Sequence, residues 1–371
     1  MRVLQICSAE GIGGGEVHVA DLSVGLHERG VHVEIATRPA SSLRDLVTAK
    51  LGSDAAFEWH TVPLRNATDL FSIRRLSRII ESNHIDIVHA HVARDYPVAA
   101  LAATPGHRAS LVLTRHHYLP IRGNIVYRRL LAKATIIAVS ESVRRTVCES
   151  LGVNSRQVVT IPNWVDLTQY AQPRERSVGR QTYGLTRRVA VALIGQIIPL
   201  KGHEEFLEAA AIVAGARTDV EFLVAGEDSE PGKPFETRLR RRVKELGLEA
   251  LVRFVGYQPD LPGLLAAVDA VAVPSWNEAF GLVAAEAMAA GRAVVASRVG
   301  GLAELIDDGV TGMLVPPKDS RQLAAAILKL AENPALVEHL GLHARADAHR
   351  FARGRGIEAV MQVYERTRMG R

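Results

Sequence analysis

The feature that most constrains the fold is an alternation along the whole chain, in which short apolar runs rich in β-forming residues are separated by helix-length amphipathic segments. The expected strands cover residues 3–7, 32–37, 57–62, 85–91, 110–116 and 135–139, and then 189–194, 221–225, 252–255, 270–273, 293–296 and 311–315. Expected helices lie between them, for example over 16–29, 70–82, 202–214, 323–331 and 335–353. Strands that alternate with helices form parallel sheets with helices on both faces. The sequence therefore predicts an α/β fold with doubly wound, Rossmann-like sheets.

Two domains are expected, because 371 residues exceed the roughly 250–300 that one core supports. The polar stretch 172–186, which contains a proline and two glycines, is interpreted as the linker between them. We expect an N-terminal domain over 1–170, a C-terminal domain over 171–355, and a last helix at about 356–371 that packs back on the first domain. Ligands of such sheets bind beyond the carboxyl ends of the strands, so the two domains should face each other across a ligand-binding cleft.

Composition excludes several classes of protein. No apolar run approaches the ~20 residues of a membrane-spanning helix, and residues 1–7 are an expected strand without the features of a signal peptide. Cys7 and Cys148 have neither disulfide nor metal-binding spacing, and we expect two buried thiols. The net charge of +5 comes without an aromatic-rich basic stripe, so nucleic acid is not an expected partner. These features predict a cytoplasmic protein.

Basic side chains gather at two places in the first half of the chain. They are Arg74, Arg75 and Arg78, and then Arg122, Arg128, Arg129 and Lys133. Such clusters can be solvated helix faces, or they can meet an acidic membrane surface or a phosphorylated acceptor. Peripheral contact with the cytoplasmic face of the membrane is therefore one of the open interpretations.

The strongest chemical signal lies in residues 274–291, a polar loop and helix that follow an expected buried strand. Gly281 permits close backbone approach where this helix begins. The amides of Phe280, Gly281 and Leu282 form an anion site there, aided by the helix dipole. Glu278, just before the helix, can bind sugar hydroxyls or can simply complement the dipole.

Glu286 is the one charged side chain in this otherwise apolar helix. The helix is apolar on nearly every side, so we expect it to be buried. A buried carboxylate needs a partner. A sugar diol, which donates two hydroxyl hydrogens, is one candidate, and an ion pair with Arg292 or Arg298 is the other.

A second signal is Lys201, in the segment 195–205 after the first strand of the second domain. A cation at the N-terminal end of a helix opposes the helix dipole. A phosphate bound between the lysine and the helix amides would resolve this conflict. Alternatively, Lys201 is solvated or pairs with Glu204 or Glu205.

The turn at residues 11–16 is rich in glycine where a Rossmann domain holds pyrophosphate, but it departs from the G-x-G-x-x-G pattern. Glu16 would crowd and repel a pyrophosphate at that turn, which disfavours a nicotinamide dehydrogenase, although Glu34 could imitate the ribose-binding acid. The glycines are interpreted as permitting close backbone approach to a ligand, or merely as a tight turn.

Histidines end two strands of the first domain. They are His89 and His91, on one face of a strand, and the doublet His116 and His117. They suit acid–base or acceptor-binding roles, or are structural. We expect no metal, because no carboxylate or cysteine stands among them at ligand spacing.

Taken together, these motifs resemble family 4 of the retaining glycosyltransferases, which have the two-domain GT-B fold, over essentially the whole chain. The most specific element is the E-x7-E pattern from Glu278 to Glu286, within PSWNEAFGLVAAEAMAAGRAVVAS. Supporting motifs are GGGE at 13–16, IPNWVD at 161–166, KG at 201–202 and GGLAELIDDGVTGMLVPP at 300–317.

The resemblance implies a role for each matching residue in the second domain. Glu286 would bind the ribose of a nucleotide, and Glu278 the hydroxyls of the donor sugar. Lys201 would neutralise the leaving diphosphate. The diphosphate would also meet backbone amides of Phe280, Gly281, Leu282 and Val283.

In the first domain, the resemblance implies that Gly14 and Gly15 approach the donor and that His116 lies at the catalytic centre. His117 is the alternative, since the doublet leaves the register uncertain by one residue. Gln196 stands where the family usually has an arginine, so the diphosphate would be less neutralised unless Arg298 substitutes. Trp164 replaces the usual glycine of IPNGVD.

The function implied is a metal-independent, retaining hexosyltransferase. It would move a sugar from a UDP- or GDP-sugar to a hydroxyl of a glycan or lipid-linked acceptor, as in cell-surface polysaccharide or glycolipid synthesis, without a cofactor. The alternatives are a nucleotide-sugar epimerase of the same fold and a non-catalytic nucleotide-sugar-binding subunit. The base, the sugar, the acceptor and the oligomeric state are left open.

Overall fold

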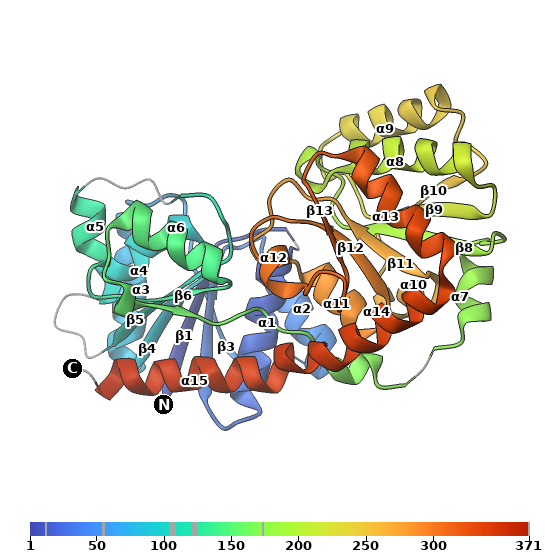
Figure 1. Ribbon diagram of the computed structural model, residues 1–371. Coiled ribbons are helices and arrows are strands. Elements are labelled where there is room, and N and C mark those ends of the chain that lie inside the picture. The colour runs from blue at the N-terminus through green and yellow to red at the C-terminus, as the bar shows by residue number, and fades with distance from the viewer. Residues whose placement is uncertain (12, 54–55, 104–108, 121–124, 173, 370–371) are drawn as a thin grey trace. The chain divides into compact units, whose positions relative to one another are not determined.

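The computed structural model describes residues 1–371 apart from 12, 54–55, 104–108, 121–124, 173 and 370–371 (Figure 1). The described chain forms two compact units. Unit 1 comprises Met1–Trp164 and Arg353–Arg371, and unit 2 comprises Val165–Ala352. The chain therefore passes from one unit to the other after Trp164 and returns after Ala352, at points that precede the expected boundaries by a few residues.

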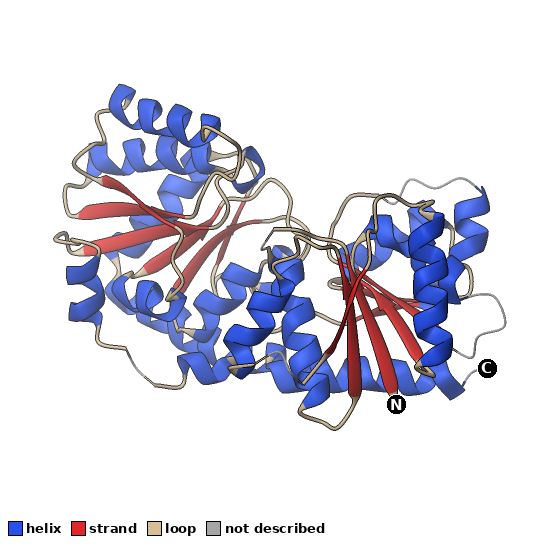
Figure 2. Cartoon of the chain, turned by 180° about the vertical axis from the view of Figure 1, so that it is seen from behind, coloured by secondary structure: helices blue, strands red, loops and turns tan. Residues whose placement is uncertain are grey.

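Within the described part of unit 1, seven parallel strands form one sheet in the order β3-β2-β1-β4-β5-β6-β7. Figure 2 shows the strands in red and the helices in blue. The strands are β1 (Arg2–Cys7), β2 (His32–Thr37), β3 (Glu58–Thr61), β4 (Ile87–Ala90), β5 (Ser110–Arg115), β6 (Thr135–Ala138) and β7 (Val158–Thr160). The helices are α1 (Gly14–His27), α2 (Leu43–Leu51), α3 (Leu70–Ser82), α4 (Tyr96–Ala103), α5 (Ile125–Leu131), α6 (Glu141–Leu151) and α15 (Arg353–Met369), with 3₁₀ turns η1 (Ala93–Asp95) and η2 (Ser155–Gln157).

Unit 2, over its described residues, has six parallel strands in the order β10-β9-β8-β11-β12-β13. The strands are β8 (Val189–Ile194), β9 (Val220–Ala225), β10 (Val252–Gly256), β11 (Ala270–Val273), β12 (Ala293–Ser297) and β13 (Met313–Val315). The helices are α7 (Arg176–Thr182), α8 (His203–Ala216), α9 (Pro234–Glu245), α10 (Leu261–Ala267), α11 (Leu282–Ala289), α12 (Leu302–Leu305), α13 (Ser320–Glu332) and α14 (Pro334–Asp347), with 3₁₀ turns η3 (Leu167–Tyr170), η4 (Pro199–Lys201) and η5 (Ala348–Phe351).

Both sheets reverse their strand order at one point, between β1 and β4 in unit 1 and between β8 and β11 in unit 2. Doubly wound sheets bind ligands beyond the carboxyl ends of the strands at such a point. The loops that follow these four strands carry the glycine-rich turn, His91, Lys201 and Glu278. The topology thus places the predicted chemistry at the ligand-binding edge of each sheet.

The predicted α/β fold with two Rossmann-like sheets is confirmed, and the bounds of β2, β8, β11 and α3 match the expected ranges to the residue. The interpretation of 172–186 as a linker is wrong, because α7 forms there and packs on α10. Arg180 of α7 also lies 3.5 Å from the buried carboxylate of Glu221.

The helix expected over 335–353 is divided into α14 and η5. In the part of the chain that the structure describes, no helix is both long and apolar enough for a membrane span.

The C-terminal helix α15 completes the core of unit 1, into which it buries Ile357, Val360, Val363 and Tyr364. Trp164 belongs to the same core and lies against Gly356 at the start of this helix. A Cβ atom on Gly356 would lie 2.1 Å from Cε3 of Trp164. The large ring that departs from the family motif therefore fits because the facing position has no side chain.

Candidate active site

In unit 2, three loops meet at the carboxyl edge of the sheet, where the strand order reverses. The loop after β11 lies in the middle, between the loops that follow β8 and β12. The amide of Trp276 donates to the carbonyl of Leu200 at 2.9 Å, and the amide of Gly301 donates to the carbonyl of Glu278 at 2.9 Å. The middle loop is therefore held by backbone hydrogen bonds from both sides.

Two glycines with left-handed backbone permit this packing. Gly202 has a φ of +74°, and a Cβ atom there would lie 2.1 Å from the carbonyl oxygen of Pro274. Gly300 has a φ of +43°, and its Cβ atom would lie 2.1 Å from the carbonyl oxygen of Glu278. No side chain fits at either contact, which explains why glycine follows Lys201 and why glycines follow β12.

Lys201 and Glu278 meet directly in this arrangement. The Nζ atom of Lys201 lies 2.6 Å from Oε2 of Glu278, and the Ser275 hydroxyl is 3.4 Å from the same oxygen. The acids weighed as partners from the sequence bind elsewhere, since Glu204 pairs with Arg238 at 2.6 Å and Glu205 accepts from the Trp276 indole at 2.9 Å.

The Lys201–Glu278 pair is accessible to a ligand. The exposed fractions are 31% for the lysine side chain and 17% for the glutamate. Partly exposed ion pairs contribute only about 0–1 kcal/mol to stability. An incoming anion can therefore take the ammonium group from Glu278 at a small energetic cost.

The helix α11 begins beside this pair, as predicted. Its N-cap is Gly281, which has a φ of +100° and no side chain to cap the helix. The left-handed backbone favours glycine here, and a Cβ atom on Gly281 would lie 2.5 Å from Cδ2 of Leu302. Phe280 is buried, whereas Leu282 and Val283 are half-buried. The glycine N-cap lets an anion approach the backbone amides of the first turn, at the positive end of the helix dipole.

Glu286 lies one turn further along α11 and is half-buried. Of the arginines weighed as its partners, Arg292 donates to the carbonyl oxygens of Ala290 and Val268. Arg298 pairs with Asp308. Burial raises the pKa of the Tyr170 hydroxyl, and the nearby Glu286 carboxylate raises it further.

Gln196, in the loop after β8, is exposed and donates from Nε2 to the Ser229 hydroxyl at 3.3 Å. Its uncharged amide thus stands at the ligand-binding edge of the sheet.

In unit 1, the glycine-rich turn and the histidine doublet come together. Gly14 and Gly15 open α1, with Gly13 as the N-cap. A Cβ atom on Gly15 would lie 3.8 Å from Cγ of His116, which directly follows β5. His116 is half-buried, whereas His117 is exposed.

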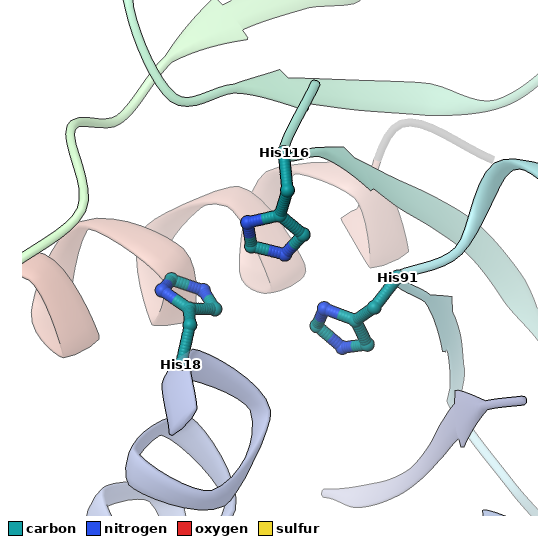
Figure 3. A group of neighbouring side chains, drawn as sticks. All are labelled: His18, His91 and His116. Atoms are coloured by element: carbon teal, nitrogen blue, oxygen red, sulfur yellow. The ribbon is translucent and has the colours of Figure 1, made fainter. Parts of the chain in front are cut away.

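Two further histidines surround His116. His91 stacks on it with ring centroids 5.8 Å apart, and His18 of α1 meets it edge-on at 4.7 Å (Figure 3). Sequence reasoning missed His18, because a histidine inside a helix gives no motif. Its position one turn after Gly14 and Gly15 was the available signal.

His89 lies beneath this group, 4.0 Å from the His91 ring, as expected for two residues on one strand face. Burial lowers the pKa of His116 and of His89 to about 3. Burial, and then neighbouring histidines, lowers the pKa of His18 and His91 well below the usual imidazole range. All four rings are therefore neutral at physiological pH.

Comparison with known proteins gives one family match in each unit. Residues 180–347 match the glycosyl transferases group 1, and residues 12–169 match glycosyltransferase family 4. A D-inositol 3-phosphate glycosyltransferase of Saccharomonospora viridis is 31% identical, over 95% of this chain and 89% of the relative. A protein of the same name from Geodermatophilus obscurus is 31% identical, over 95% of this chain and 84% of that relative.

Solved structures agree on the fold. Alr3699/HepE of Anabaena, in complex with UDP and glucose, is 25% identical with a TM-score of 0.85, over 98% of this chain and 99% of that chain. The sucrose-phosphate synthase of Thermosynechococcus elongatus is 22% identical with a TM-score of 0.80, and the match covers 100% of each chain. The chain therefore belongs to the group 1, family 4 glycosyltransferases of the GT-B fold.

Proposed function

We propose that the protein is a retaining glycosyltransferase that takes a sugar from a UDP- or GDP-sugar and transfers it to a hydroxyl group of an acceptor. The observation that carries this proposal is the contact of Lys201 with Glu278 beside the N-terminus of α11, which brings the E-x7-E pattern and the lysine into one site. The HepE structure with UDP and glucose supports a nucleotide-sugar donor.

The proposed chemistry is electrostatic. Negative charge grows on the diphosphate as its bond to the sugar breaks. The Lys201 ammonium and the first amides of α11 would receive this charge, and one such donor typically contributes a factor of about 10²–10³ in rate. The acceptor hydroxyl would attack on the same face and pass its proton to the leaving phosphate, so no protein nucleophile, metal or cofactor is assigned.

The remaining residues receive binding roles in the proposal. Glu278 would accept hydrogen bonds from the donor sugar after its lysine turns to the diphosphate, and Glu286 would accept them from the ribose. In unit 1, His116 would contact the sugar, while Gly14 and Gly15 allow close backbone approach.

A nucleotide panel tests the donor site. The unfolding temperature of the full chain is measured with UDP, GDP, ADP, dTDP and NAD⁺, for wild type, Glu286→Ala, and the control Glu304→Ala, which removes an exposed carboxylate of unit 2. A ligand at 100 times its Kd stabilises the folded state by about 2.7 kcal/mol. We expect UDP or GDP to stabilise wild type and the control but not Glu286→Ala. Stabilisation by NAD⁺ alone would contradict the proposal.

Two acceptor classes follow from different observations. The basic first half favours a lipid-linked or glycan acceptor in polysaccharide or glycolipid synthesis, whereas the curated relatives favour a phosphorylated cyclitol. An assay of sugar transfer distinguishes the two acceptor classes. It uses the donor whose nucleotide stabilises the protein, and it compares inositol 3-phosphate with a polyprenyl-linked sugar as acceptors. Donor conversion without any acceptor would instead indicate an epimerase.

Peripheral membrane contact is proposed for α5 and for Leu119. Leu119, Ile125 and Val126 are 67%, 64% and 67% exposed. The exposed cations Arg128, Arg129 and Lys133 follow them in the sequence. Arg122 lies outside the described residues. Exposed apolar side chains next to basic ones bind anionic bilayers. Sedimentation with phosphatidylglycerol vesicles should decrease in Val126→Asp, and unchanged sedimentation would contradict this contact.

A further inference from the structure

Three imidazole rings from separate parts of unit 1 converge in Figure 3. His18 comes from α1, His91 follows β4, and His116 follows β5. One nitrogen from each ring lies within 4.8 Å of a nitrogen from each of the others, a grouping identified among the described residues. His18 and His91 are only 7% and 4% exposed, and His116 is half-buried.

A hydrogen bond determines which ring nitrogen of His91 has a lone pair available for a ligand. Its Nε2 atom lies 2.7 Å from Oε1 of Gln5. An amide oxygen only accepts hydrogen bonds, so Nε2 carries the proton and Nδ1 carries a lone pair. A hydrogen bond that orients the far nitrogen in this way is typical of metal-binding histidines.

Gln5 is itself held in place. Its Nε2 atom donates to the Tyr364 hydroxyl at 3.3 Å, and that hydroxyl lies 2.6 Å from Nδ1 of His89. The other ring nitrogen of His89 lies 2.7 Å from the Thr114 hydroxyl. A connected buried network therefore supports the orientation of His91.

Several nitrogens of the cluster lack a partner. Nδ1 of His91 and both ring nitrogens of His116 are buried and form no hydrogen bond with the described residues. A buried polar atom without a partner is energetically unfavourable. Each of these two histidines therefore has a lone pair to offer to a ligand that lies among the rings.

We propose that His18, His91 and His116 bind a divalent transition-metal ion of the Zn²⁺ and Co²⁺ class. Three imidazoles suit these ions, whereas Mg²⁺ and Ca²⁺ prefer oxygen ligands. Zn–N distances of about 2.0–2.1 Å would place the nitrogens roughly 3.3 Å apart, so the rings close inward on binding.

The ion has a consequence that rests on the proposed function. If His116 contacts the donor sugar, a metal ion that takes its lone pair removes it from that role. The site would then be inhibitory, and the enzyme would stay active without metal but lose turnover when Zn²⁺ binds. Metal binding by the three histidines does not depend on the proposed donor site in unit 2.

Co²⁺ titration of the chelator-treated full chain tests the binding, with the visible absorption of four-coordinate Co²⁺ as the readout. The exposed pair His339 and His343, with rings 4.2 Å apart on α14, could also bind metal. All measurements therefore use a His343→Ala background. The variants are His18→Gln and His116→Gln, and the matched control is His117→Gln, which changes the exposed neighbour.

We expect one bound Co²⁺ in the background and in the control, and at least a 100-fold weaker affinity in His18→Gln and His116→Gln. The metal-free circular-dichroism spectrum and unfolding temperature of each variant, equal to those of the background, show that unit 1 still folds. Equal Co²⁺ affinity in all variants, or no binding in the background, would overturn the metal site. Turnover with Zn²⁺ is read separately, and binding without inhibition would refute the sugar contact of His116 but not the metal site.

Discussion

The substitution Gly300→Ala tests whether the packing of the loop after β11 shapes the donor site. An alanine there must hold the left-handed conformation, with a φ of +43°. Its methyl group would also begin 2.1 Å from the carbonyl oxygen of Glu278, which is backbone and cannot rotate away. The main chain at Glu278 must therefore move, and its contact with Lys201 must change.

The expected loss of folding stability in Gly300→Ala is the sum of two separate energetic costs. Left-handed backbone costs an alanine roughly 1–2 kcal/mol. The clash adds about 1–3 kcal/mol, as overpacking usually does. Gly309→Ala isolates the first cost, because Gly309 has a φ of +80° and no described atom lies within 4 Å of its Cβ position. In a unit of this size each kcal/mol lowers the unfolding temperature by about 2–4 °C.

The assay is thermal unfolding of both variants with and without UDP. We expect Gly309→Ala to lose about 1–2 kcal/mol and to keep the stabilisation by UDP. Gly300→Ala should lose more and should respond less to UDP, because Glu278 and Lys201 no longer meet as before. Equal destabilisation and an equal response to UDP in the two variants would refute the reasoning.

Three further predictions concern single side chains. Lys201→Ala should lower kcat by about 10²–10³, and Gln196→Arg should tighten UDP binding by adding a charge, both measured by steady-state kinetics and titration calorimetry. Burial raises the pKa of Asp95 from 3.8 to about 6 despite hydrogen bonds from Ser8. Its stabilising effect is therefore full below pH 4 and lost as the pH rises through 6, so Asp95→Asn should be more stable than wild type at pH 8, by roughly 3 kcal/mol at most, but not at pH 4, in urea unfolding.

The fold was predictable because most strands are short apolar runs bounded by polar turns, as in 189–194 and 270–273. The linker interpretation failed because proline and glycine favour loops locally, whereas α7 is stabilised by its contact with α10 and by Arg180 beside Glu221. Such stabilisation depends on tertiary packing and leaves no local signal.

The site was predictable as a set of residues but not as a set of contacts. Lys201 and Glu278 were both selected, yet the partners considered for Lys201 were its sequence neighbours Glu204 and Glu205. The true partner comes from another loop, which Gly202 and Gly300 allow to approach. His18 was not selected, because only the folded α1 brings it to His116.

The most direct test of the donor site is a crystal structure of the full chain with UDP. We expect the diphosphate oxygens within hydrogen-bond distance of Lys201 Nζ and of the first amides of α11, with the ribose hydroxyls on Glu286. A diphosphate bound instead at the glycine-rich turn Gly13–Gly15 of unit 1 would contradict the assignment of the donor site to unit 2.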